Sequence, residues 1–204
     1  HPSKVRWRDT FWYMDRCGTD GVPIVILISF LMGLILGFQS AIQLRAFGAD
    51  IYLADLVGLS ICKELGPLMV AMICTGRAGS AFAAEIGTMK VSEEVDALTT
   101  MGLDPHRFLV VPKVVALMTM MPLLTIFGDV AGLAGGLVVG MTQLNLPFIA
   151  YWTQTLAALS HVHIIEGLIK SVVFAFLISG VGCLRGLRTE SRSEERRVGK
   201  ECAT

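Results

Sequence analysis

Four long apolar stretches divide this sequence, and each is long enough to cross a lipid bilayer. They cover Val22 to Leu44, Leu56 to Ala84, Val114 to Gly140 and Ile164 to Leu184. A helix needs about 20 apolar residues to cross roughly 30 Å of hydrocarbon, and within lipid it satisfies its own backbone hydrogen bonds. The pattern therefore predicts an all-α membrane protein with four transmembrane helices, occupying residues 21–190.

The segment before the first apolar stretch, residues 1–20, carries Trp7, Phe11 and Met14 at roughly helical spacing among basic residues. This pattern is typical of a helix that lies in the membrane interface. Trp12 falls outside the stripe, so a partly ordered arm remains the alternative.

Basic residues in short loops mark the cytoplasmic side of a membrane protein. They occur before the first stretch, between the second and third, and after the fourth, whereas Met141 to His163 has none. We therefore expect a cytoplasmic N-terminus and a periplasmic 141–163 loop, with a short surface helix over 147–159 and interfacial aromatic side chains at Phe148, Tyr151 and Trp152. The basic residues are Lys4, Arg6, Arg8, Arg16, Lys90, Arg107, Lys113, Arg185 and Arg188.

Composition agrees with a bilayer environment, because 53% of residues are hydrophobic, only 17% are charged and the mean hydropathy is +0.64. A net charge of zero makes nucleic acid an unlikely class of partner. No phosphate-binding loop, H-E-x-x-H motif or nucleophile elbow is present, so we expect no catalytic residue and no bound cofactor. The five cysteines form no C-x-x-C pair, and His161 and His163 do not share a helix face, so we expect no metal site.

Charged residues interrupt the apolar stretches at Lys63, Glu64, Asp129 and Lys170. Such a side chain costs about 2.5–3.5 kcal/mol at the centre of a bilayer and normally faces a cavity or a partner. From the helical rise, these four side chains are expected to lie at one level in the outer half of the bilayer. They could form a charge-balanced cluster that fixes helix packing, or a polar edge to a substrate cavity.

Other features of these stretches concern helix shape and packing. Gly66-Pro67 predicts a kink, because proline removes a backbone hydrogen bond. The glycine repeats of the first and third stretches predict close helix contacts. Arg77, nearer the cytoplasmic end, is expected to snorkel or to form an ion pair.

The loop between the second and third stretches predicts one more helix, over residues 91–101. Val91, Val95 and Leu98 recur at helical spacing, Ser92-Glu93-Glu94 offers a cap and an acidic first turn, and Gly102 follows. A charged cytoplasmic helix of this kind could dock on a motor subunit. Periodicity alone leaves an ordinary solvated loop equally open.

Several motifs carry a family resemblance. Glu64-Leu65-Gly66-Pro67, Gly76-Arg77-Ala78-Gly79-Ser80-Ala81, residues 84–90 (AEIGTMK) and residues 93–98 (EEVDAL) occur in order. Together with Met101-Gly102, Asp104-Pro105 and matches farther on, they make residues 24–190 similar to the MlaE/YrbE permeases.

The resemblance implies the permease of an ABC transporter that moves phospholipid between the inner and outer membranes of bacteria. It implies an inner-membrane homodimer with a separate ATPase subunit, which would use the ATP, and a periplasmic MCE-domain protein. The lipid-cavity residues would be Lys63, Glu64, Asp129 and Lys170. The coupling residues would be Glu93, Glu94, Asp96, Leu98, Met101 and Gly102.

Residues 191–204 stand apart from the resemblance. Arg192 to Cys202 is similar to a translated sequencing adapter, so we expect 191–204 to be non-native, with a charged cytoplasmic tail as the alternative. On this interpretation the chain is a fragment that lacks the fifth transmembrane helix of its relatives.

Two other classes of protein compete with a lipid permease. One is an ion-coupled transporter with a relay of Asp129, Glu64 and Lys170, and the other is a membrane scaffold.

Overall fold

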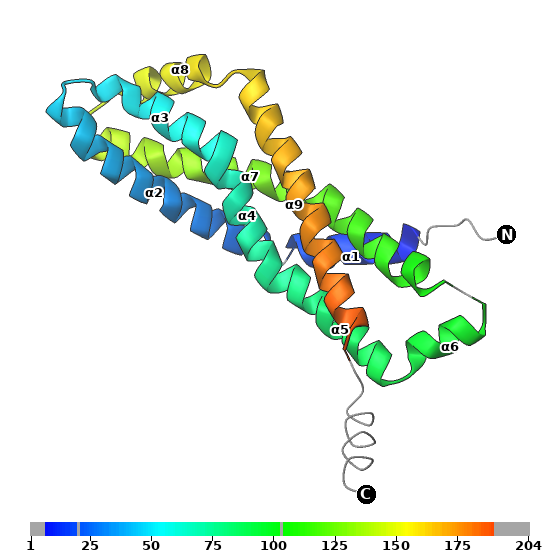
Figure 1. The fold of residues 1–204 in the computed structure, drawn as a ribbon. Helices are drawn as coiled ribbons and strands as arrows, with labels where there is room; N and C mark the ends of the chain where they lie inside the picture. The colour runs from blue at the N-terminus through cyan, green and yellow to red at the C-terminus, as the bar shows by residue number, and fades with distance from the viewer. Residues whose placement is uncertain (1–6, 20, 103, 190–204) are drawn as a thin grey trace, which may run out of the picture.

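The computed structural model describes residues 7–19, 21–102 and 104–189, and the regular elements in this part of the chain are all helical (Figure 1). The predicted non-native segment 191–204 lies outside the described residues, as do Lys4 and Arg6. The α-helices are α1 (Trp7–Thr19), α2 (Val22–Ala46), α3 (Leu53–Ser60), α4 (Gly66–Cys74), α5 (Ser80–Val91), α6 (Glu94–Thr100), α7 (Val111–Gln143), α8 (Phe148–Ala158) and α9 (His161–Leu187). Shorter turns are η1 (Asp50–Tyr52), η2 (Ile61–Leu65), η3 (Thr75–Gly79) and η4 (His106–Val110).

Four helical segments are long and apolar enough to cross a membrane, as the sequence predicted. They are Val22–Ala46, Asp50–Val91, Phe108–Gln143 and His161–Leu187. The second is a composite of η1, α3, η2, α4, η3 and α5, which follow one another without a loop. All four segments extend a few residues beyond the predicted apolar stretches, because polar residues at the ends continue the helical hydrogen bonding.

Helix α7 is the centre of the bundle, because α1, α2, α4 and α9 all pack against it. Its closest neighbour is α2, and glycine makes that approach possible. A β-carbon added to Gly33 would overlap the carbonyl group of Gly132, and one added to Gly135 would overlap the carbonyl oxygen of Phe30. The glycine repeats are therefore packing positions, as expected.

Buried apolar side chains form two clusters along the bundle axis. One joins α4 and α5 to α7 and α9, and the other joins α2 and α3 to α7 and α8. The first contains Val70, Phe82, Ile86, Leu117, Met121 and Leu124, among others. The second contains Ala41, Leu53, Ala54, Val57, Ile61, Val139 and Tyr151.

The surface helix predicted over 147–159 is present as α8, but one of its three aromatic side chains has a different position. Phe148 and Trp152 are half-exposed and stacked, whereas Tyr151 is only 2% exposed. The interfacial placement of Tyr151 was therefore wrong. Its ring fills the space above Gly136 and Gly140, which leave room for it because they have no side chain. Burial raises the pKa of Tyr151 to about 12, so the hydroxyl stays protonated.

The N-terminal segment is a helix, α1, rather than an unstructured arm over its described part. Its packed face differs from the predicted stripe, because Thr10 and Gly18 are buried while Phe11 is 63% exposed. Trp12, outside the predicted stripe, is exposed next to Phe11. Two adjacent exposed aromatic residues suit contact with lipid. Placement of α1 in the membrane interface stays a prediction.

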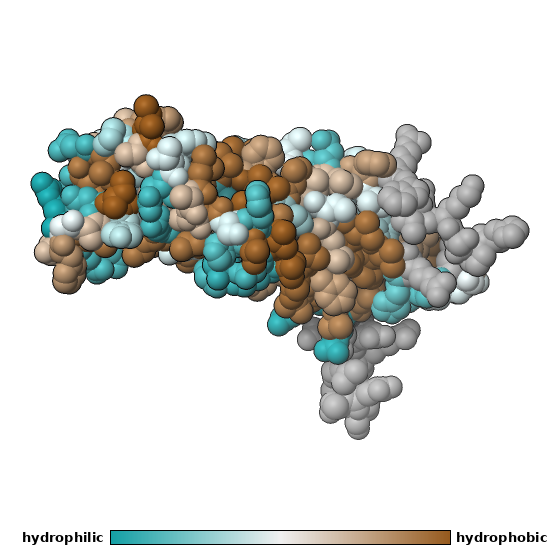
Figure 2. Space-filling model, turned by 90° about the horizontal axis from the view of Figure 1, so that it is seen from above, coloured by the Kyte–Doolittle hydropathy of each residue, from teal (hydrophilic) through white to brown (hydrophobic). Residues whose placement is uncertain are grey.

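The outer surface of the bundle is largely apolar, as a lipid-facing surface must be. Figure 2 shows hydrophobic residues over most of the central part of the face it presents, with hydrophilic patches between them and toward the end formed by α2, α3 and α8. Exposed residues such as Leu27, Ile35, Val130 and Phe176 contribute to this surface.

The predicted orientation places α6 in the cytoplasm and the turn before α8 outside. A single cysteine at Thr100 should therefore resist a membrane-impermeant maleimide added to intact cells, while one at Asn145 should react. Both positions are exposed, so accessibility within the protein is matched. The background would be a variant with the natural cysteines replaced. Reaction of the cysteine at position 100 and none at position 145 would show that the protein has the opposite orientation in the membrane.

Candidate functional site: an intramembrane charge cluster

The composite helix 50–91 changes direction at a π-helical turn that carries Lys63 and Glu64 (Figure 1). This turn, η2, ends where Gly66-Pro67 begins α4. The N–H of Gly66 bonds to the carbonyl of Ile61, five residues earlier, instead of to the residue four earlier. The predicted helix distortion at Gly66 and Pro67 is therefore present, in the form of a π turn, which is a known cause of helix bends.

Pro67 leaves one backbone acceptor without its usual donor. In an α-helix the carbonyl of Lys63 would accept from the N–H of residue 67, and proline has none. The ammonium group of Lys170 takes that place, since its Nζ lies 3.0 Å from the Lys63 carbonyl oxygen. The donor that Pro67 lacks is thus supplied by a side chain from α9.

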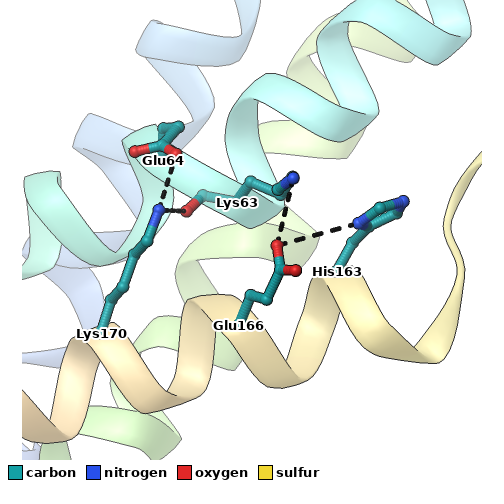
Figure 3. A network of polar contacts seen from close by, with 5 residues as sticks. All are labelled: Lys63, Glu64, His163, Glu166 and Lys170. Carbon is teal, nitrogen blue, oxygen red and sulfur yellow. Dashed lines mark hydrogen bonds and ion pairs between the residues drawn. The ribbon is translucent and has the colours of Figure 1, made fainter.

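Five side chains from η2 and α9 form a chain of ionic contacts (Figure 3). Lys170 Nζ also binds Glu64 Oε1 at 2.6 Å. Lys63 Nζ binds Glu166 Oε2 at 3.1 Å, and His163 Nδ1 lies 4.0 Å from that same oxygen. With His163 neutral, two ammonium groups balance two carboxylates. We call Lys63, Glu64, His163, Glu166 and Lys170 the charge cluster.

The helices that carry the cluster can meet because Gly167 lies at their contact. A β-carbon on this residue would overlap the carbonyl oxygen of Cys62. Glu166 and Lys170 are separated by four residues and His163 and Glu166 by three, so these side chains share one face of α9. The glycine brings this face directly against η2.

The cluster is exposed at the surface of the described chain. The side chain of Glu64 is 67% exposed and that of Lys170 is 39% exposed, although both lie within apolar spans. A carboxylate facing acyl chains at this depth would be costly. The exposed atoms therefore require water, another protein surface or a polar ligand.

Asp129 lies near the predicted level, beside Gly66, but it is not a member of the cluster, so the expected meeting of the four charged side chains does not occur. Among the described residues, no hydrogen bond or ion pair joins it to Lys63, Glu64 or Lys170. Its Oδ1 atom is buried without a hydrogen-bond partner, close to the α-carbon of Gly66. Asp129 projects from α7 into the contact with α4, where its carboxylate lies against Gly66.

Glu166 and His163 are cluster residues that the sequence interpretation missed. Their spacing from Lys170 was a usable signal, because residues three and four positions apart share a helix face. Glu166 was visible as a charge at the start of an apolar stretch. Its partner Lys63 could not be identified without knowing how α9 is rotated against η2.

The predicted coupling helix is present as α6 but is shorter than 91–101. Val91 belongs to the preceding helix, α5, and α6 begins at Glu94. The hydroxyl of Ser92 donates to the carbonyl of Thr88 in α5, so it does not cap α6. Glu93 holds the N-cap position with a φ of 62° and forms no side-chain cap. The predicted cap was therefore wrong, while the acidic first turn of Glu94 and Asp96 was right.

The surface of α6 combines acidic and apolar groups. Glu93 and Glu94 are exposed, Leu98 is half-buried, and Met101 at the end of the helix is 66% exposed. Asp96 binds Lys90 of α5 at 2.7 Å, which ties the two helices together. Gly102 ends the helix with a φ of 74°, a conformation that favours glycine.

A second ionic contact lies at the opposite end of the composite helix, where the sequence predicted a loop lysine. Lys113 belongs to α7 and its side chain is 0% exposed. Its Nζ lies 3.1 Å from Glu85 Oε2, an ion pair without hydrogen-bond alignment. The nitrogen also lies 5.2 Å from the centre of the Tyr13 ring, and the Tyr13 hydroxyl donates to Glu85 Oε1 at 2.6 Å. These three side chains connect α1, α5 and α7, which makes Lys113 a core residue and not a loop charge.

Comparison with known proteins agrees with the motifs. The family model described as "Permease MlaE" matches residues 10–203. A probable ABC transporter permease protein of Rickettsia typhi is 43% identical over 169 residues, which are 83% of this chain and 65% of that protein. The chain thus spans about two thirds of the length of this relative.

Two further relatives have more specific names. The intermembrane phospholipid transport system permease protein MlaE of Haemophilus influenzae is 34% identical over 89% of this chain and 70% of its own length. The chloroplastic protein TRIGALACTOSYLDIACYLGLYCEROL 1 of Arabidopsis thaliana is 31% identical over 91% of this chain and 53% of its own length. With four apolar spans and a family match over most of its length, the chain is a multi-pass membrane protein that belongs to the MlaE family of ABC transporter permeases.

Proposed function

We propose that this chain moves phospholipid between membranes and that the charge cluster contacts the lipid head group. The observation that carries the proposal is the exposure of Glu64 within an apolar span. A phospholipid head group supplies what that surface needs, since it is polar and reaches the bilayer attached to apolar chains. The phospholipid transport named for the relative from Haemophilus influenzae supports the same substrate class.

The charges of the cluster suit a zwitterionic head group. Lys63 and Lys170 would attract a phosphate, and Glu64 and Glu166 would attract an ammonium group such as that of ethanolamine. Each of these side chains already has a partner of opposite charge in the absence of lipid. Binding would therefore exchange partners without leaving an unpaired charge.

The remaining parts of the proposal concern partners and location. The chain would act in the bacterial inner membrane with a cytoplasmic N-terminus, as a homodimer with an ATPase subunit and a periplasmic MCE-domain protein. An ABC permease needs a separate source of energy, and the exposed acidic and apolar groups of α6 provide a surface for the ATPase.

Two measurements test the proposal. The complete protein, purified from its native bacterium, should retain an ATPase and transfer labelled phospholipid between proteoliposomes only with ATP. A photo-crosslinking residue at Glu64 should capture head-group-labelled lipid more efficiently than one at Ile169, which is exposed on α9 beside Lys170. Equal capture of lipid at positions 64 and 169 would show contact with bulk lipid only and would contradict the head-group role of Glu64. Transfer of lipid without ATP would contradict the ABC mechanism.

The role of α6 gives a separate prediction. Glu94→Lys should weaken retention of the ATPase at least tenfold, because reversing one charge in a complementary surface typically costs several kcal/mol. Asp96 is a poorer choice of variant, since it also holds Lys90. Membrane insertion should be unchanged because Glu94 is exposed and forms no bond within the described residues.

The matched control is Thr99→Lys, on the same short helix. Co-purification of the ATPase would be measured by quantitative immunoblotting at equal permease levels. Normal retention with Glu94→Lys would leave α6 as a structural turn with no docking role at this position.

A further inference from the structure

Helix α8 lies alongside the bundle and not across its end. In Figure 1 it runs beside α3, and it contacts both α3 and α7. The Tyr151 ring packs against Gly140 of α7, close to Leu53 of α3. Leu159, which follows the last residue of α8, packs against Gly58. Because Gly58 comes after Leu53 in α3, α8 runs in the same direction as α3, away from the α2–α3 turn and into the bundle.

Helix α2 shows how deep α8 reaches. It has 25 residues, about 37 Å of helix, which is only a little more than the roughly 30 Å of hydrocarbon. Near its middle, Gly33 contacts Gly132 of α7. The next residue of α7, Leu133, lies against Gly58, and so does Leu159. The end of α8 is therefore level with the middle of α2, about 20 Å of helix from the end that faces the α2–α3 turn.

The outward face of α8 suits contact with hydrocarbon. Ile149, Trp152 and Leu156 share this face and are 74%, 50% and 58% exposed. The helix contains no charged residue, and its threonine hydroxyls donate to carbonyls of the preceding turn. The Gln154 amide donates to both carboxylate oxygens of Asp55 at 2.9 Å, so it too has a partner inside the protein. At this depth, such a face continues the apolar outer surface of the four spans.

We propose that α8 is a re-entrant helix, which enters the bilayer from the α2–α3 end and exposes Ile149, Trp152 and Leu156 to the acyl chains of that leaflet. With 11 residues, about 16 Å, it is too short to cross the bilayer. The chain then returns as α9, whose first turn carries His163 of the charge cluster. Non-helical backbone at such a depth is tolerated beside a water-filled cavity, and the exposed Ser160 between the two helices lies at the polar surface that the cluster already requires. This placement does not depend on the proposed transport function.

Depth measurements by spin labelling test this placement in the complete protein, reconstituted in vesicles of phosphatidylethanolamine and phosphatidylglycerol. Single labels would replace Ile149 or Leu156 in a variant without the natural cysteines. Power saturation then compares collisions with oxygen, which concentrates in hydrocarbon, and with a nickel chelate, which stays in water. The ratio of oxygen to nickel collisions should rise from position 149 to position 156, about 10 Å farther along the helix. The matched controls are Ile42 and Ile35, exposed on α2 with the same spacing, where the ratio should rise by a similar factor.

Trp152 provides a second measurement that needs no substitution in α8. With Trp7 and Trp12 replaced by Phe, its fluorescence should be quenched by lipid brominated on the acyl chains and not by iodide added to the water. Equal collision ratios at positions 149 and 156 would show a helix parallel to the membrane surface. Weak collisions with both reagents would show that another protein chain covers this face. Either result, or quenching of Trp152 by iodide instead of lipid, would overturn the proposal.

Discussion

Glu64→Lys is expected to reduce ATP-dependent phospholipid transfer at least tenfold while the protein still accumulates in the membrane. The substitution brings a third ammonium group beside Lys63 and Lys170, so the surface changes from neutral to positive and repels the ammonium group of a zwitterionic lipid. Stability should be largely preserved, because the Glu64 side chain is 67% exposed. Lys170 also keeps its bond to the Lys63 carbonyl oxygen.

A charge exchange separates head-group binding from helix packing. Glu64→Lys combined with Lys170→Glu restores an ion pair but reverses the positions of the two charges. If the pair only fixes η2 against α9, this double variant should regain both protein level and transfer. If the pair contacts lipid, the double variant should have a normal protein level, like Glu64→Lys alone, and transfer should remain low. Transfer would be measured in proteoliposomes and protein level by immunoblotting, and full recovery of transfer would contradict the proposed head-group role.

Glu85→Ala is expected to destabilise the protein by about 3–5 kcal/mol, because it leaves Lys113 charged, buried and without its carboxylate. Tyr13 would lose its acceptor as well. The measurement is resistance to unfolding of the complete protein in detergent micelles, together with its level in membranes. Such a loss is a large fraction of the stability of most domains.

Two further variants give this prediction its controls. Glu85→Ala combined with Lys113→Met should recover most of the stability, because it removes the charge from the buried position on α7, whereas the Glu85 side chain itself is 41% exposed. Asp96→Asn breaks the exposed Lys90–Asp96 pair and should cost less than about 1 kcal/mol. A Glu85→Ala protein as stable as Asp96→Asn would show that Lys113 finds another partner or loses its proton.

The sequence was sufficient to predict the four spans, since long apolar runs in lipid have few structural alternatives. It also predicted the contact between Lys170 and Glu64, because both lie at the same level. Lys113 illustrates what a linear pattern cannot reveal. It follows Pro112 at the edge of an apolar run, where a lysine normally marks a loop, and its partner Glu85 lies 28 positions earlier on another helix.

Rotation about the helix axis was the main unknown. The depth of Asp129 in the bilayer follows from its position in the sequence, whereas the helix that it faces depends on the packing of α7. The π turns η2 and η3 add to this difficulty, because each wide turn rotates the residues after it relative to a regular α-helix. Patterns based on a period of 3.6 therefore lose phase after Ile61 and again after Thr75.

The glycine contacts also determine where hydrocarbon can be held. At Gly33 and Gly132 the backbones of α2 and α7 touch, and at Gly167 and Cys62 so do those of α9 and η2. These two seams are sealed against an acyl chain. A lipid whose head group reaches Glu64 therefore cannot place its tails between α2 and α7 at Gly33, or between α9 and η2 at Gly167.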